Sequence, residues 1–89
     1  MAIYKDQEFL EFVINSIVSK PEEVVIKRTV DDMGVLYTLD VAKEDIARVI
    51  GRDGQIVRAI RLLLRTVGYS LKVRANLKVN APLIEKHIS

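Results

Sequence analysis

The most constraining feature of the sequence is a pair of glycines, Gly51 and Gly54, between two stretches with helical character. Apolar residues recur at helical spacing on both sides of the pair, which predicts one helix before it and another after it. Gly51 is suited to end the first helix, and Asp53 is placed to cap the second from just outside its first turn. Because neither glycine has a Cβ atom, the backbone of another molecule can approach this main chain closely.

The hydrophobic pattern of the whole chain predicts an α+β fold with the order α-β-β-α-α-β, in which helices cover a three-stranded sheet. Helices are predicted over residues 6–19 and 54–67, with a short helix beginning at 43–45. Alternating residues predict strands over 23–30, 35–41 and 70–79, and the first two should pair through a hairpin turn at 31–34. Residues 80–84 are predicted to form a short capped helix or an ordered tail.

The inner faces of the two long helices follow from the same spacing. Pro21 is expected to end the first helix, and Gly68 the second. The first helix is predicted to bury Leu10, Val13, Ile14, Ile17 and Val18, with Phe9 and Phe12 widening the stripe. The second is predicted to bury Ile56, Ile60, Leu63, Leu64 and Val67.

The charges are divided unevenly along the chain, although its net charge is only +2. Residues 1–47 carry a net charge of −5, whereas residues 48–78, which contain the two glycines, carry +7. A positive segment around an open main chain fits a polyanionic ligand. A solvated helix face and a solvated strand face explain the same charges, and charge alone does not separate the two interpretations.

The composition gives no support to catalysis or metal binding. The chain has no cysteine and one histidine, His87, so neither a disulfide framework nor a thiolate zinc site is expected. The loop between the glycines lacks the Gly-Lys-Ser/Thr ending of a phosphate-binding P-loop. We therefore expect no catalytic residue, no cofactor and no bound metal. The chain shows no signal-peptide pattern and no apolar run of bilayer length, which predicts a cytoplasmic protein without membrane contact.

Residues 49–60 carry a Val-Ile-Gly-x-x-Gly pattern followed by Gln55 and Ile56, and they resemble the K-homology (KH) domain. The two strands before the motif and the single strand after it resemble the type II arrangement, and the length is similar to that of stand-alone bacterial KH proteins of the KhpA kind. The resemblance covers about residues 6–79. It implies a KH domain at 1–79 and a short C-terminal extension at 80–89.

The resemblance also implies a function, which is non-enzymatic binding of single-stranded RNA as an RNA chaperone or post-transcriptional regulator. KH domains hold about four nucleotides between the glycine loop and a sheet edge. The implied roles are backbone approach at Gly51 and Gly54, a phosphate contact at Arg52, an apolar floor of Ile46, Ile50 and Ile56, and peripheral phosphate contacts at Arg48, Arg58 and Arg61. Asp53 completes the loop, and its negative charge beside a phosphate is expected to weaken binding.

Other interpretations of the same residues remain open. The two glycines also suit a tight turn with no ligand, and Lys72, Arg74 and Lys78 also suit a solubilising strand face. The resemblance further implies a homodimer or a heterodimer with a larger KH-containing protein. The alternative function is a dimerisation or docking module with weak RNA affinity, in which a partner helix occupies an exposed groove at Ile46, Ile50 and Ile56.

Overall fold

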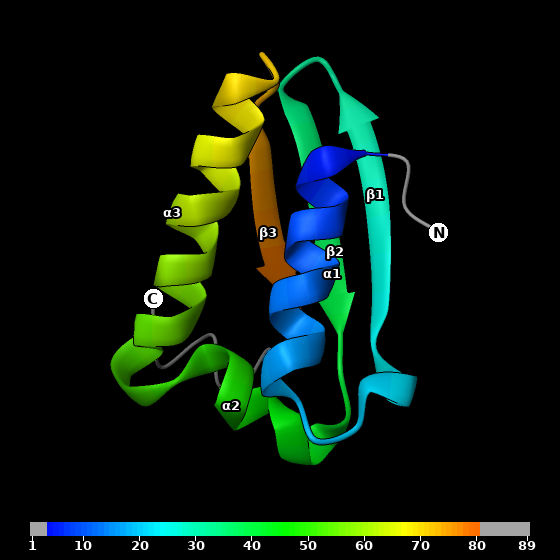
Figure 1. Ribbon diagram of the computed structural model, residues 1–89, viewed down its shortest axis with the longest axis vertical. Helices are drawn as coiled ribbons and strands as arrows, with labels where there is room; N and C mark the ends of the chain where they lie inside the picture. The colour runs from blue at the N-terminus through cyan, green and yellow to red at the C-terminus, as the bar shows by residue number, and fades with distance from the viewer. Residues whose placement is uncertain (1–3, 81–89) are drawn as a thin grey trace.

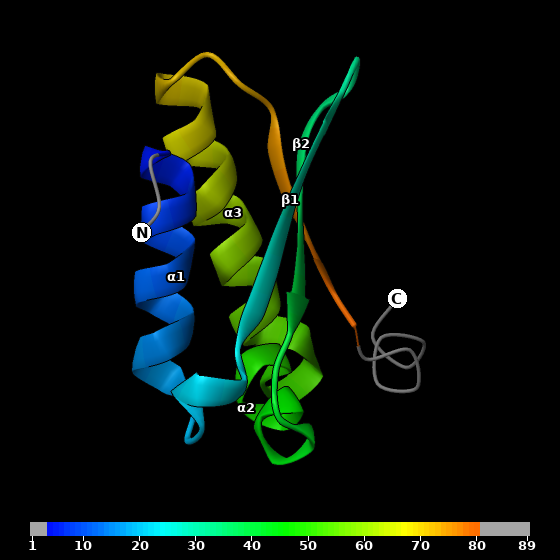
Figure 2. The ribbon, with the colours of Figure 1, turned by 90° about the vertical axis from the view of Figure 1, so that its right-hand side faces the viewer.

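The computed structural model describes residues 4–80 and contains one three-stranded sheet with all the helices on one side (Figures 1 and 2). The elements are α1 (Lys5–Ile17), β1 (Val25–Asp31), β2 (Gly34–Asp40), α2 (Ile46–Ile50), α3 (Gln55–Ser70) and β3 (Ala75–Val79). This confirms the predicted order and fold class. The residues predicted to form a terminal helix or tail lie outside the described part of the chain, apart from Asn80.

Strand β2 lies in the middle of the sheet, in the order β1-β2-β3. It pairs with β1 in antiparallel fashion through the predicted hairpin, where the Met33 N–H donates to Asp31 Oδ1 at 2.7 Å. It pairs with β3 in parallel, with Val35 opposite Ala75 and Leu39 opposite Val79. Parallel neighbours need a crossover connection, and α2 and α3 supply it.

The alternation predicted for the strands sets which sheet face is buried. Side chains Val35, Tyr37 and Leu39 of β2 and Ala75, Leu77 and Val79 of β3 are buried under the helices. They form one core with Leu10 and Ile14 of α1, Val49 and Ile50 of α2, and Val57, Ile60 and Leu64 of α3. Within residues 4–80, no helix lies on the opposite face of the sheet (Figure 2).

Helix α3 buries only part of the face predicted for it, because Ile60 and Leu64 are buried but Ile56 and Leu63 are not. Its buried residues are Val57, Ile60, Leu64 and Gly68, whereas Ile56 and Leu63 are 40% and 51% exposed. The two stripes share Ile60 and Leu64 and are only slightly offset around the helix, so spacing alone could not separate them. Packing against β3 and α1 decides between them, because α3 contacts both elements.

Gly68 does not end α3, which continues to Ser70. A Cβ atom at Gly68 would lie 2.9 Å from both the Ala75 Cβ and the Val73 carbonyl oxygen. The glycine therefore allows α3 to approach the following strand closely. The last helical residue, Ser70, and a turn with a positive φ of 63° at Lys72 occupy residues predicted as strand, so β3 begins only at Ala75.

Helix α1 also departs from its prediction at two points. It ends at Ile17, before Pro21, because Val18 already has an extended backbone. Phe12 is 73% exposed and does not belong to the buried stripe. Asp6, in the first turn of α1, is buried beside Tyr37.

The start of α1 covers a small polar cluster. The Arg28 Nε donates to the Tyr37 hydroxyl at 3.3 Å, and the Arg28 guanidinium lies 3.7 Å from the centre of the Tyr4 ring. Burial, together with a hydrogen bond to Asp6, raises the pKa of the Tyr37 phenol to about 12. Among residues 4–80, no helix has the length and apolar character that a membrane span requires.

Candidate nucleic-acid interface

The two glycines form the turn that the sequence predicts between α2 and α3. Gly51 ends α2 with φ 77° and ψ 176°, and its N–H donates to the Ala47 carbonyl oxygen at 2.8 Å. One 3₁₀ turn, Arg52–Gly54, follows, and Gly54 has φ 75°. The backbone angles of Gly51 lie in a region essentially restricted to glycine. The helical path is therefore broken at this turn (Figure 1).

The absence of a Cβ atom at Gly51 has a structural use in the protein itself. A Cβ atom there would lie 2.8 Å from the Ile56 Cβ and 2.9 Å from the Ile56 nitrogen. Gly51 thus allows the end of α2 to pack directly against the first turn of α3. This requirement exists with or without a ligand.

Asp53 does not have the capping role predicted from the sequence. Its backbone is left-handed, with φ 53° and ψ 26°, and the residue at the N-cap of α3 is Gly54, with no side-chain capping bond. Aspartate is one of the few residues besides glycine that tolerate this conformation. The exposed carboxylate therefore adds negative charge to the loop without satisfying the start of α3.

The three isoleucines predicted as an apolar floor differ in exposure. Ile50 is only 2% exposed and belongs to the core, so the expectation that it lines an exposed groove is wrong. Ile46 is partly buried against the same core. Ile56 is 40% exposed beside the loop, because α3 turns its neighbour Val57 inward. Of the three, Ile56 offers the most surface to a ligand.

The predicted basic residues have two kinds of environment. Arg48, Arg52 and Arg58 are exposed around the glycine turn. Arg61 is half-buried, and its Nε donates to the Leu77 carbonyl oxygen at 3.0 Å. Arg61 thus ties α3 to the outer edge of β3, a role that its position on a basic helix face did not reveal.

The outer edge of β3 is the sheet edge nearest to α3 (Figure 1). At Leu77 both backbone groups on this edge are engaged by side chains. The carbonyl accepts from Arg61, and the N–H donates to the Asn76 Oδ1 at 2.8 Å. At the centre of this edge, a bound nucleic-acid strand would therefore meet the side chains of Arg61 and Asn76, because the Leu77 N–H and carbonyl are already hydrogen-bonded to them.

Asp45 holds α2 in place, and sequence analysis missed it. Its fully buried carboxylate accepts the Ser19 N–H at 2.8 Å, the Ser19 hydroxyl at 2.8 Å and the Lys20 N–H at 2.9 Å. Burial opposes the ionisation of Asp45, but the hydrogen bonds from Ser19 and Lys20 and the charge of Arg48 hold its pKa below the ordinary 3.8. The link joins the chain after α1 to the residue that precedes α2, one short helix before the glycine turn. No pattern signal separates this aspartate from the surface Glu44 beside it.

Within the described residues, 4–80, no three histidine, cysteine or carboxylate side chains lie close enough to hold a metal ion. The surroundings of the turn are instead an exposed Arg52, an exposed helix start and a half-exposed Ile56. The positive end of the α3 dipole and the nearby guanidinium groups favour an anion here. A phosphodiester backbone with a base that presents its flat ring face has the matching chemistry.

Comparison with known proteins gives one family. The family model for the KH domain of KhpA and KhpB matches residues 7–79. The chain is 41% identical over 73 residues to an RNA-binding protein KhpA of Chlamydia pneumoniae, covering 82% of this chain and 94% of the relative. It is 39% identical over 70 residues to the RNA-binding protein KhpA of Oceanobacillus iheyensis, covering 79% and 88%. No solved structure gives a significant match.

Proposed function

Because this chain belongs to the KhpA/KhpB family of KH domains, we propose that it binds single-stranded RNA at the Gly51–Gly54 turn and catalyses no reaction. Its role is that of an RNA chaperone or a post-transcriptional regulator, acting in the cytoplasm. The named function of the relatives supports the ligand class. The observation that carries the assignment to this site is the break between α2 and α3, which leaves Arg52 exposed between two glycines with positive φ.

In the proposed complex the sugar-phosphate backbone lies against the turn. Arg52 contacts a phosphate, and the start of α3 adds the favourable end of its dipole. Ile56 supports a base by apolar contact, while Arg48 and Arg58 interact with flanking phosphates. Most of these contacts depend on charge and none involves a base edge, so the affinity should fall with salt and select only weakly among sequences.

The domain is proposed to comprise residues 1–79, with residues 80–89 as an extension that the RNA contact does not require. A chain ending at residue 80 should therefore bind RNA as the full chain does. Asp53 is proposed to keep the affinity modest, because its exposed carboxylate stands in the loop beside the phosphate path.

A second proposal concerns self-association or pairing with a larger KH protein. The outward face of α3 exposes Leu62 and Leu63, and Phe12 is exposed on the neighbouring α1. Exposed leucines at adjacent positions of an otherwise basic helix favour a protein partner. Light scattering of wild type and Leu63→Lys tests self-association: a wild-type dimer that the substitution converts to a monomer supports it, and a wild-type monomer at every concentration contradicts self-association.

The RNA proposal is tested by titrating a fluorescein-labelled single-stranded RNA at low salt with wild type, Arg52→Glu and Lys27→Glu. Both positions are exposed, so both variants should keep the melting temperature of the wild type. Arg52→Glu should weaken binding at least tenfold, whereas Lys27→Glu, on the edge strand β1, should change it by less than threefold. Equal losses in the two variants would assign the affinity to net charge and not to the turn.

A further inference from the structure

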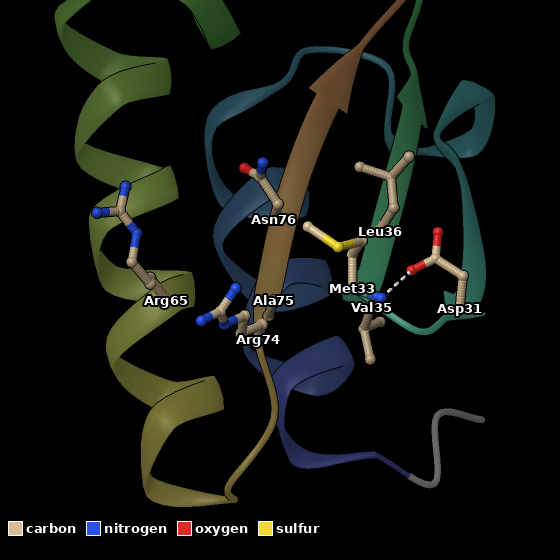
Figure 3. A pocket seen from close by; sticks show the side chains of 8 residues that line it. All are labelled: Asp31, Met33, Val35, Leu36, Arg65, Arg74, Ala75 and Asn76. Carbon is tan, nitrogen blue, oxygen red and sulfur yellow. Dashed lines mark hydrogen bonds between the residues drawn. The ribbon is translucent and has the colours of Figure 1, made fainter.

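The open face of the sheet contains a shallow cavity of about 470 Å³ at the end where β1 and β2 meet (Figure 3). It lies between the hairpin, the start of β3 and the last turns of α3. The lining residues that matter here are Asp31, Met33, Leu36, Arg65, Arg74 and Asn76. None of them is among the residues assigned above to the RNA contact at the glycine turn.

The floor of this cavity is apolar and exposed. Met33 is 73% exposed at the hairpin, and Leu36 is 36% exposed on the outer face of β2. Figure 3 shows the Met33 side chain extending toward β3, above the strand pair. A flexible thioether and a leucine make a surface on which a flat ring can rest, since a methionine side chain adapts to the shape of its contact.

The side of the cavity nearest α3 is cationic. Arg65 projects from α3, and Arg74 is the residue just before β3 (Figure 3). Within residues 4–80 neither arginine makes an ion pair. The Asn76 oxygen is used by the Leu77 N–H, which leaves the amide NH₂ as a donor. Asp31 lies on the opposite, β1 side, and its Oδ1 already accepts the Met33 N–H. An anion is therefore favoured on one side of a flat apolar floor.

Helix α3 connects this cavity to the glycine turn. Arg58, Arg61 and Arg65 are spaced by three and four residues and share one helix face. The contact of Arg61 with the Leu77 carbonyl shows that this face borders β3. From Arg58 to Arg65 the helix rises about 10 Å, at 1.5 Å per residue. A strand that leaves the turn along this face reaches the cavity without crossing the buried side of the protein.

We propose that a single-stranded RNA held at the Gly51–Gly54 turn continues along α3 and places one further base in this cavity. The base rests on Met33 and Leu36, and the phosphates beside it contact Arg65 and Arg74. The footprint is then longer than the roughly four nucleotides that a KH loop holds. This inference rests on the proposed RNA binding at the turn, and it adds a second contact that short RNAs cannot reach.

The first test compares wild type with an Arg65→Ala/Arg74→Ala double variant on a four-nucleotide and an eight-nucleotide RNA. A Lys5→Ala/Lys27→Ala double variant removes two exposed charges that do not line the cavity and is the matched control. Each affinity is compared on the same oligomer, because a longer RNA offers more binding registers. The arginine variant should lose about tenfold on the longer RNA and less than twofold on the shorter one. Its salt dependence on the longer RNA should flatten by about 1.4 in the slope of log affinity against log salt, as expected for two lost phosphate contacts.

The second test observes binding in the wild-type protein, and a variant serves only to assign the signal. The chain has two methionines, Met1 and Met33, so a methyl-labelled spectrum contains two methionine signals, which Met33→Leu assigns. The Met33 signal should shift with the eight-nucleotide RNA and stay in place with the four-nucleotide RNA. An unmoved Met33 signal at saturation, or equal losses of both RNAs in the arginine variant, would overturn the inference while the turn contact stands. Failure of wild type to bind either RNA would overturn the proposed function as well.

Discussion

Replacing Gly51 by alanine should destabilise the fold strongly, even though only one methyl group is added. The new Cβ atom would lie 2.8 Å from the Ile56 Cβ, closer than such atoms approach in folded proteins, and the neighbour is a branched side chain held at the start of α3. The backbone at Gly51, with φ 77° and ψ 176°, is also strained for any residue with a side chain.

The two effects allow an estimate of the loss. Backbone strain of this kind costs about 1–3 kcal/mol, and crowding by an added methyl group costs about 1–3 kcal/mol. The free energy of unfolding should therefore fall by about 2–6 kcal/mol. Because 1 kcal/mol shifts the melting temperature of a domain of this size by about 4–8 °C, the melting temperature should fall by at least about 8 °C.

Gly54→Ala is the matched comparison. Its backbone is simply left-handed, with φ 75° and ψ 16°, and this conformation costs a non-glycine residue only about 1–2 kcal/mol. Urea unfolding of the two variants should rank Gly51→Ala as clearly the less stable. A loss below 1 kcal/mol at Gly51, or a larger loss at Gly54, would refute the packing argument. Because a Gly51 variant loses stability, a loss of RNA binding in that variant would not show that RNA contacts Gly51. The binding test therefore uses a substitution at the exposed Arg52.

Four further predictions concern single groups. Asp53→Asn keeps the left-handed backbone and should tighten RNA binding about two- to fourfold in a low-salt titration. The reason is that the repulsion between one charge and a phosphate about 6 Å away in water costs about 0.7 kcal/mol. An unchanged affinity would show that the phosphate lies elsewhere. Gly68→Ala should lower the free energy of unfolding by about 1–2 kcal/mol in urea, because crowding against β3 exceeds the gain in helix propensity. The Asp45 carboxylate has a lowered pKa, so its contribution to stability is present above pH 3.8 and is lost as the pH falls through the folded-state value. The difference in melting temperature between wild type and Asp45→Asn should therefore shrink as the pH is lowered below 3.8. The Tyr37 phenol has a raised pKa, so its contribution to folding stability is present below pH 10 and is lost as the pH rises through the folded-state value. An absorbance titration should show the phenol ionising near pH 12.

The parts of this fold that follow from sequence are those fixed by local periodicity and turn chemistry. The alternation in β2 and β3 places Tyr37 and Leu77 in the core, and residues 31–34 form the predicted hairpin. The glycine pair ends one helix and begins the next where the pattern indicates. Each of these features depends on residues a few positions apart, so no tertiary contact is needed to infer it.

The features that sequence did not reveal depend on contacts between distant segments. Whether α3 turns Ile56 or Val57 inward is decided by the surfaces of α1 and β3. In the sequence Gly68 resembles the end of a helix. Only its close contact with Ala75 shows that the glycine allows α3 to pack against the next strand. The Asp45 carboxylate accepts hydrogen bonds from backbone groups 25 and 26 residues away. A charged residue just before a helix is ordinarily expected to be exposed, so the sequence alone did not indicate that Asp45 is buried.

The most direct test of RNA binding at the glycine turn is a map of backbone amide signals during titration with a short single-stranded RNA at low salt. The signals of residues 51–56 should shift first and furthest, with the outward face of α3 and the end of the molecule at Lys72 unaffected. The largest shifts at Leu62 and Leu63, or an unchanged spectrum at saturating RNA, would contradict the assignment of RNA binding to this turn.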